Sequence, residues 1–227
     1  MSLPDNTTPT PRRAFLERAA AGTVALAAAP LLASCAAPAA APAAAPADEE
    51  PWIKPLTGKH KQVFDAPATN EGFPLIFAMA YLNSMTGALK LQPGDVNAII
   101  IVRHVGIGMA LTDAIWAKYK LGEALKIMDP QTKRPSTRNF FINSKEGDIM
   151  MTDASADKLM KRGVIIGACN IALTVLSGKL GAGIGVKPED ALKEWTAGVI
   201  PGAYVVPSGV MAVGRAQEKG CSYCFAG

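Results

Sequence analysis

A short apolar run that ends on a cysteine and passes at once into helix-forming residues constrains the fold of this chain most. It extends from Gly163 to Leu173 and reads GVIIGACNIAL. Val164, Ile165 and Ile166 form a β-branched run that is too short for a helix interior, and a run of this kind bounded by glycines is typical of a strand buried on both faces. Cys169 is therefore predicted to lie where a strand ends and a helix begins.

Cys169 is the candidate nucleophile of the chain. In open α/β sheets, ligands and reactive groups collect at the carboxyl ends of the strands. The free N–H groups of the helix that follows such a strand stabilise a negative charge, which favours a thiolate. The alternative is that Cys169 is simply a small buried hydrophobic residue, since free cysteines are among the most buried residue types. Its position favours the functional interpretation.

Residues 1–34 are interpreted as a targeting signal. The segment 10–16, TPRRAFL, has the twin-arginine pattern of a bacterial export route, and residues 19–32 form an alanine-rich apolar core too short to be a membrane span. Residues 32–35, LASC, resemble a bacterial lipobox, in which cleavage before Cys35 leaves it as a lipidated N-terminus. This pattern predicts a protein anchored by its lipid on the periplasmic side of a membrane. The alternative is cleavage by ordinary signal peptidase, which would give a soluble periplasmic protein.

The rest of the chain is divided into a tether and one domain. Residues 35–51 are rich in alanine and proline and end in three acids, which is typical of an extended tether. Residues 52–227 are long enough for a single domain with a sizeable core. The formal net charge of +4 is small and evenly spread, and no basic stripe with interleaved aromatic residues occurs. A nucleic-acid partner is therefore not expected.

Short apolar runs alternate with helical patterns throughout this domain. Strands are expected at 61–64, 95–102, 164–169, 203–206 and 221–225, and helices at 73–89, 111–125, 152–162, 170–179, 188–198 and 208–219. Repeated strand-then-helix units predict an α/β fold with a mostly parallel sheet and helices on both faces. The segment 129–147 breaks the pattern, with two prolines, four basic residues and the pair Phe140-Phe141. We expect it to be a lid or a subunit contact that exposes this aromatic pair.

The C-terminal third resembles the DsrE/DsrF sulfur-relay family. The resemblance is carried by GVIIGACNIAL, by Val205-Val206-Pro207-Ser208-Gly209, and by the closing strand from Cys221 to Phe225, in the family's order and spacing. It implies a three-layer α/β/α domain with a five-stranded parallel sheet, assembly into homo-oligomers, and a cysteine at position 169 that carries sulfur as a persulfide in some members. The chain departs from the family pattern in three ways. It is expected to be exported, it has the additional segment 129–147, and it has a cysteine at position 221, where tyrosine is common.

Several other residues are weighed as site residues. His104 follows the strand 95–102 and is expected at the same edge of the sheet as Cys169, where an imidazole could shuttle protons or stabilise the thiolate. The alternative is a structural histidine. Arg103 and Asp113 are nearby in the sequence and could complete a polar cluster. No metal site is expected, because the chain has only two histidines and no carboxylates cluster around them. No cofactor fingerprint is complete.

The pair Cys221 and Cys224 has the C-x-x-C spacing, but it lies in an expected strand. Residues three apart on a strand point to opposite faces, which opposes both a local disulfide and a shared metal. With Cys35 lipidated, three cysteines remain, so at least one is unpaired within the monomer.

Two function classes stay open. The first is a sulfur carrier or thiol-dependent sulfurtransferase acting through Cys169 with a protein donor or acceptor of sulfur. The second is a non-catalytic assembly or small-ligand-binding protein on the same fold.

Overall fold

The structure, a computed structural model, describes residues 50–227. The predictions for residues 1–34, including the twin-arginine signal, the prediction for Cys35 and nearly all of the tether lie outside the described residues.

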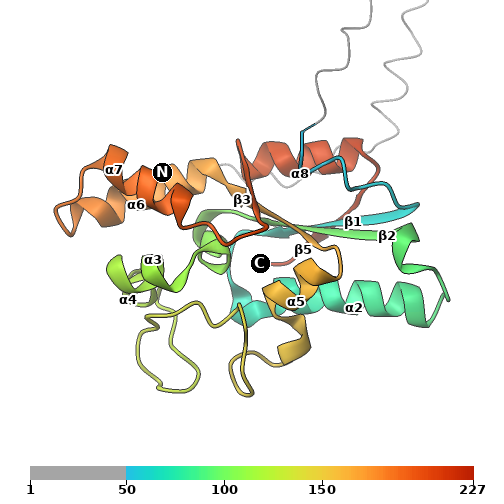
Figure 1. Cartoon of the computed structure of the whole chain (residues 1–227), viewed down its shortest axis with the longest axis horizontal. Coiled ribbons are helices and arrows are strands. Elements are labelled where there is room, and N and C mark those ends of the chain that lie inside the picture. The colour runs from blue at the N-terminus through green and yellow to red at the C-terminus, as the bar shows by residue number, and fades with distance from the viewer. Residues whose placement is uncertain (1–49) are drawn as a thin grey trace, which may run out of the picture. The chain divides into compact units, whose positions relative to one another are not determined.

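One parallel sheet of five strands organises the described part of the chain (Figure 1). Its spatial order is β4-β3-β2-β1-β5, and every neighbouring pair is parallel. The strands are β1 (His60–Ala66), β2 (Val96–Val102), β3 (Ile165–Cys169), β4 (Tyr204–Val206) and β5 (Ser222–Phe225).

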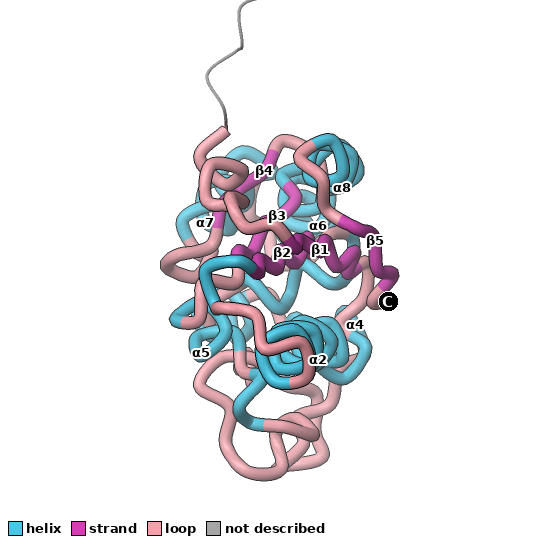
Figure 2. Tube along the Cα trace, turned by 90° about the vertical axis from the view of Figure 1, so that its right-hand side faces the viewer, coloured by secondary structure: helices cyan, strands magenta, loops and turns pink. Residues whose placement is uncertain are grey.

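Helices cover both faces of this sheet, and Figure 2 shows α2 and α8 on opposite sides of the strands. One core cluster packs between the sheet and α2, α5, α6 and α7, and the second packs under α8 and the segment 52–56. The predicted three-layer α/β/α fold with a five-stranded parallel sheet is confirmed. The α-helices are α2 (Phe73–Gly87), α3 (Asp113–Lys118), α4 (Leu121–Leu125), α5 (Ala156–Lys161), α6 (Asn170–Ala182), α7 (Pro188–Ala197) and α8 (Gly209–Glu218). Short 3-10 helices are η1 (Asn70–Gly72), η2 (Pro93–Asp95), η3 (His104–Ala110) and η4 (Thr152–Ala154).

Strand β2 shows why the apolar runs form strands with two buried faces. Successive side chains of a strand point to opposite sides of the sheet. Ile100 and Val102 therefore pack in the larger cluster, while Ile99 and Ile101 pack in the smaller one. Complete burial of each aliphatic side chain contributes about 1.5–3 kcal/mol. A continuous run of such residues is thus stable only in the middle of a covered sheet.

Two expected helices are interrupted in the structure. The single helix predicted over 111–125 is wrong, because Lys120 has a left-handed backbone (φ 48°) and separates α3 from α4. The break brings Gly122 against the backbone of Ser136, where an added Cβ would lie only 2.2 Å from the Ser136 nitrogen. The helix predicted over 152–162 starts later, because a turn of 3-10 helix precedes α5, whose N-cap residue is Ser155.

The segment 129–147 is packed against the domain, and the expected exposure of its aromatic pair is wrong. Phe140 and Phe141 are only 4% and 0% exposed. Both rings pack on Trp116 of α3, with centroid distances of 6.3 and 6.4 Å. The Asn139 side chain donates to the Leu111 carbonyl oxygen (2.7 Å), which ties this end of the segment to the entrance of α3. The pair therefore belongs to the core and does not mark an interface.

Arg138 holds this segment closed through a partly buried ion cluster, in which the two carboxylates are buried and the guanidinium is partly exposed. Its Nε donates to Asp129 Oδ2, and its Nη2 donates to Asp148 Oδ1, both at 2.6 Å. The Asp148 side chain is 0% exposed. The hydrogen bond from Arg138 is the main cause that lowers the pKa of Asp148 to about 2. For Asp129, burial is the largest single cause and raises the pKa. The hydrogen bonds from the Thr132 backbone, Arg138 and the Gln131 backbone together outweigh burial, so the pKa is lowered overall.

Candidate functional site

Polar side chains from several strands meet around Cys169 at the carboxyl edge of the sheet. Cys169 is the last residue of β3 and is 5% exposed. Arg103 directly follows β2, Asp65 lies near the end of β1, and Gly209 begins α8 after β4. All strands are parallel, so their carboxyl ends lie at one edge, the usual place for ligands and reactive groups in such sheets.

The Cys169 sulfur faces the start of α8. The Gly209 N–H donates to Cys169 Sγ at 3.1 Å. Free N–H groups at a helix start carry partial positive charge and stabilise a nearby anion. The sequence pointed to the helix after Cys169, which is α6, as the source of this stabilisation. Cys169 is indeed the N-cap residue of α6, but the hydrogen bond to its sulfur comes from α8, some 40 positions later.

Position 209 has no room for a side chain larger than that of glycine. An added Cβ would lie 2.8 Å from Arg103 Cβ and 3.2 Å from Cys169 Cβ. The close approach of α8 to the sulfur therefore depends on glycine. Ser208 caps this helix, because its Oγ accepts a hydrogen bond from the Met211 N–H. The Ser208-Gly209 pair was the available sequence signal for this contact, since it places a cap and a residue without Cβ directly after a strand.

Arg103 forms an ion pair with Asp65 near the thiol. Its Nε and Nη2 donate to the two carboxylate oxygens of Asp65 at 2.7 and 2.9 Å. The hydrogen bond to Asp65 is the main cause that raises the pKa of Arg103, and the proximity of Cys169 contributes in the same direction. The Tyr223 hydroxyl of β5 also donates to Asp65 (3.0 Å), so the carboxylate is held on two sides. Neither Asp65 nor Tyr223 was predicted as a site residue.

Of the residues expected to assist Cys169, Arg103 lies close to it, whereas His104 and Asp113 are placed differently. His104 is exposed and has a left-handed backbone (φ 49°). The side chain packed against Gly209 is that of the preceding residue, Arg103. A role for His104 in proton transfer stays a prediction. Asp113 accepts a hydrogen bond from the Asn139 N–H (2.7 Å), so its carboxylate contacts the segment 129–147.

Cys221 and Cys224 lie on opposite faces of the sheet, as predicted. Cys221 is buried in the smaller core cluster, whereas Cys224 packs against the larger one. Both are free thiols, and burial raises the pKa of each. Raised pKa values lower the thiolate fraction at neutral pH, so neither is a strong nucleophile. Among residues 50–227, no three His, Cys, Asp or Glu side chains group closely enough to hold a metal ion.

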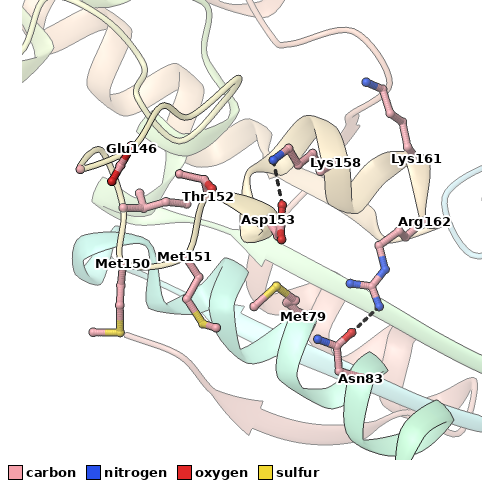
Figure 3. Close-up of a pocket in the computed structure, with 12 residues that line it drawn as sticks. Met79, Asn83, Glu146, Met150, Met151, Thr152, Asp153, Lys158, Lys161 and Arg162 are labelled. Atoms are coloured by element: carbon pink, nitrogen blue, oxygen red, sulfur yellow. Dashed lines mark hydrogen bonds and ion pairs between the residues drawn. The ribbon is translucent and has the colours of Figure 1, made fainter.

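Several cavities lie away from Cys169. The first, called here the methionine groove, has a volume of about 740 Å³ and is drawn in Figure 3. Met79, Met150 and Met151 line its apolar part. Its charged rim is paired internally, because Lys158 Nζ donates to Asp153 (2.9 Å) and Arg162 donates to Asn83 (2.7 Å). The hydrogen bond from Arg162 joins the end of α5 to α2, so this groove follows the contact between the two helices.

The second cavity, called here the loop cavity, has a volume of about 870 Å³. It opens between the segment 68–73, which follows β1, and the segment 125–133, with Phe140 and Phe141 among the residues of its wall. Val105, two residues after Arg103, also lines it. It therefore lies at the carboxyl edge of the sheet, as the Cys169 cluster does.

Comparisons with known proteins give a similar solved structure but no matching family model or curated protein. No protein-family model matches this chain, and no curated protein matches it. One solved structure, that of a protein of unknown function from Methanobacterium thermoautotrophicum, is similar with a TM-score of 0.40 and 16% sequence identity. That similarity covers 73% of this chain and 98% of the other.

Proposed function

We propose that this chain is an exported, DsrE/DsrF-like sulfur carrier or thiol-dependent sulfurtransferase that acts through Cys169. One observation carries the proposal: the Gly209 N–H reaches Cys169 Sγ at 3.1 Å while the Arg103 guanidinium is held beside it by Asp65. A helix start and a cation are the surroundings that favour thiolate, the form of cysteine that attacks sulfur. Neither of the other two described cysteines accepts a hydrogen bond from a helix start, and burial is the main cause that raises the pKa of each.

The transfer step needs no oxidant. The Cys169 thiolate attacks the outer sulfur of a donor persulfide, R–S–SH, and a new S–S bond forms. The donor's S–S bond breaks, and its electron pair leaves with the donor as the thiolate R–S⁻. The outer sulfur and its proton remain on Cys169 as a persulfide, which an acceptor thiolate can attack in the same way. The Gly209 N–H and Arg103 stabilise the anionic sulfur before and after each transfer.

Incubation of the purified protein with polysulfide is expected to add sulfur to Cys169. Mass spectrometry of peptides should detect added sulfur on Cys169 in preference to Cys221 and Cys224, whose burial raises their pKa values. Cys169→Ser should abolish the adduct with little change in stability, because the two side chains are close in volume. Cys224→Ser is the matched control and should load normally. A wild-type protein that carries no sulfur on Cys169 contradicts the proposal.

We also propose that the protein is held on the periplasmic side of a membrane by lipid at Cys35. The support is the twin-arginine pattern followed by LASC in residues 32–35. Within residues 50–227, no helix is long and apolar enough to cross a bilayer. Cys35→Ala is expected to move the protein from the membrane fraction to the soluble periplasmic fraction, because the lipidated residue is lost. Equal distribution of wild type and variant would favour ordinary signal peptidase cleavage instead.

Exposed apolar side chains near the carboxyl edge suit a protein partner. Ile171 at the start of α6, Val210 at the start of α8 and Phe225 at the end of β5 are all exposed. Apolar side chains grouped on a surface mark protein contacts. We propose this edge as the docking place for a donor or acceptor protein, with homo-oligomer assembly as the family resemblance implies.

A second candidate function is a non-catalytic small-ligand-binding protein. The loop cavity favours it, because its volume of about 870 Å³ lies within the range of small-molecule sites and it opens at the carboxyl edge of a parallel sheet.

A further inference from the structure

The loop cavity combines an apolar wall with a charged mouth. Phe73, Ile127 and Phe140 contribute apolar surface, and Glu71, Lys126 and Lys133 contribute charges. Arg138 pairs with both acids of the same lining, Asp129 and Asp148, and this cluster keeps one negative charge. Lys126, Lys133 and Glu71 form no ion pair with any other described residue. Among these unpaired side chains the two lysines outnumber the one glutamate, so the positive charge available at the mouth is that of Lys126 and Lys133.

Thr69 is a largely buried residue whose hydroxyl has no hydrogen-bond partner within residues 50–227. It lines the cavity, is 9% exposed, and makes no side-chain hydrogen bond to any residue within 50–227. A hydroxyl in this position is therefore available to a molecule in the cavity.

The same wall has an unusual backbone. Asn70, Glu71 and Gly72 are three consecutive residues in the left-handed region, with φ values of 40°, 53° and 90°. Lys126, on the facing segment, also has a left-handed backbone (φ 57°). Non-glycine residues held in this region concentrate at ligand sites, where the surrounding structure enforces them.

We propose that the loop cavity binds a small organic anion, a carboxylate or sulfonate with an apolar or aromatic body. The body lies against Phe73, Ile127 and Phe140, and the anionic group lies at the mouth near Lys126 and Lys133, with Thr69 as a hydrogen-bond donor. This inference deepens the second candidate function and does not require sulfur transfer at Cys169.

Isothermal titration calorimetry with naphthalene-2-sulfonate tests the proposal on the Cys169→Ser protein, which removes any thiol reaction from the measurement. We expect saturable binding, and binding about tenfold weaker for the neutral analogue naphthalene-2-methanol. The affinity for the sulfonate should fall as salt is added, because exposed lysines are screened. Sodium sulfate alone should not bind, because it lacks the apolar body.

Matched variants locate the site. Lys126→Gln with Lys133→Gln is expected to weaken sulfonate binding about tenfold and to leave binding of the neutral analogue unchanged. Lys90→Gln with Lys120→Gln is the control, since these two lysines are also exposed, unpaired among the described residues and left-handed in backbone (φ 57° and 48°), but do not line the cavity. Thr69→Val should weaken binding several-fold, and Thr69→Ser should restore it.

Three results would overturn the proposal. Equal affinity for the sulfonate and the neutral analogue would leave a ligand site without anion selectivity. An equal loss in both pairs of lysine variants would indicate a general surface effect. No binding of either probe would reject both this inference and the second candidate function, while sulfur loading of wild-type Cys169 would remain an independent result.

Discussion

Replacing Arg138 by leucine is expected to lower the free energy of unfolding by about 3–5 kcal/mol, the typical cost of leaving a buried carboxylate without its partner. The variant leaves Asp129 and Asp148 without their shared guanidinium, and the Asp148 side chain is 0% exposed. Leucine cannot satisfy either carboxylate. The segment 129–147, with Phe140 and Phe141 in the core, should then separate from α3 at lower urea concentration. Urea unfolding followed by tryptophan fluorescence measures the change, because both rings pack on Trp116.

Arg134→Leu is the matched control for this variant. Arg134 lies in the same segment, is exposed, and its side chain forms no ion pair with the described residues. Its replacement should change stability by no more than about 0.5 kcal/mol. Equal losses in the two variants would show that the ion cluster does not hold the segment.

The stabilisation from Arg138 also has a defined pH dependence. The pKa of Asp148 is about 2 in the folded protein, below its value of about 3.9 in an unfolded chain. A lowered pKa stabilises the folded state fully above pH 4, and this contribution, about 2 kcal/mol, is lost as the pH falls through 2. In Arg138→Leu the unpaired carboxylates take up protons at higher pH. The stability gap between wild type and variant should therefore narrow below pH 4, and a constant gap from pH 7 to pH 2 would contradict this account.

Gly209→Ala is expected to slow the alkylation of Cys169 by iodoacetamide at pH 7 by about tenfold. The added Cβ would lie 2.8 Å from Arg103 Cβ, which is near the backbone and cannot move freely. The start of α8 must then shift, and the hydrogen bond from the Gly209 N–H to Cys169 Sγ is lost. A hydrogen bond to a charged group contributes about 1.5–3 kcal/mol, and 1.4 kcal/mol corresponds to a tenfold change. The clash should also cost about 1–3 kcal/mol of stability.

Gly214→Ala on the same helix provides the control. An added Cβ at Gly214 meets no atom within 4 Å, so this variant should leave the Cys169 rate unchanged. It should also stabilise the protein by up to about 1 kcal/mol, because alanine favours helix more than glycine. Rates at Cys221 and Cys224, measured in the same digests, report general opening of the structure. An unchanged Cys169 rate in Gly209→Ala would mean that α8 does not activate the thiol.

Short-range patterns were enough to predict the strands, the layers and the position of Cys169. The β-branched runs in β2 and β3 can be buried only in a covered sheet, and the alternation with helices requires parallel strands, whose carboxyl ends meet at one edge. These features depend on neighbouring residues and their periodicity. The sequence alone was therefore sufficient to place Cys169 between a strand and a helix, and to separate Cys221 from Cys224 across the sheet.

Tertiary structure alone decided which groups surround the thiol and where the segment 129–147 lies. Asp65, Arg103 and Gly209 are far apart in the chain, and only the strand order brings them to Cys169. Phe140 and Phe141 follow polar residues and have no periodicity, so local pattern suggested a surface segment. Their burial on Trp116, closed by Arg138 between two carboxylates, follows from long-range packing. Local sequence cannot encode such contacts, because the free energy of each depends on residues that become neighbours only after the sheet has formed.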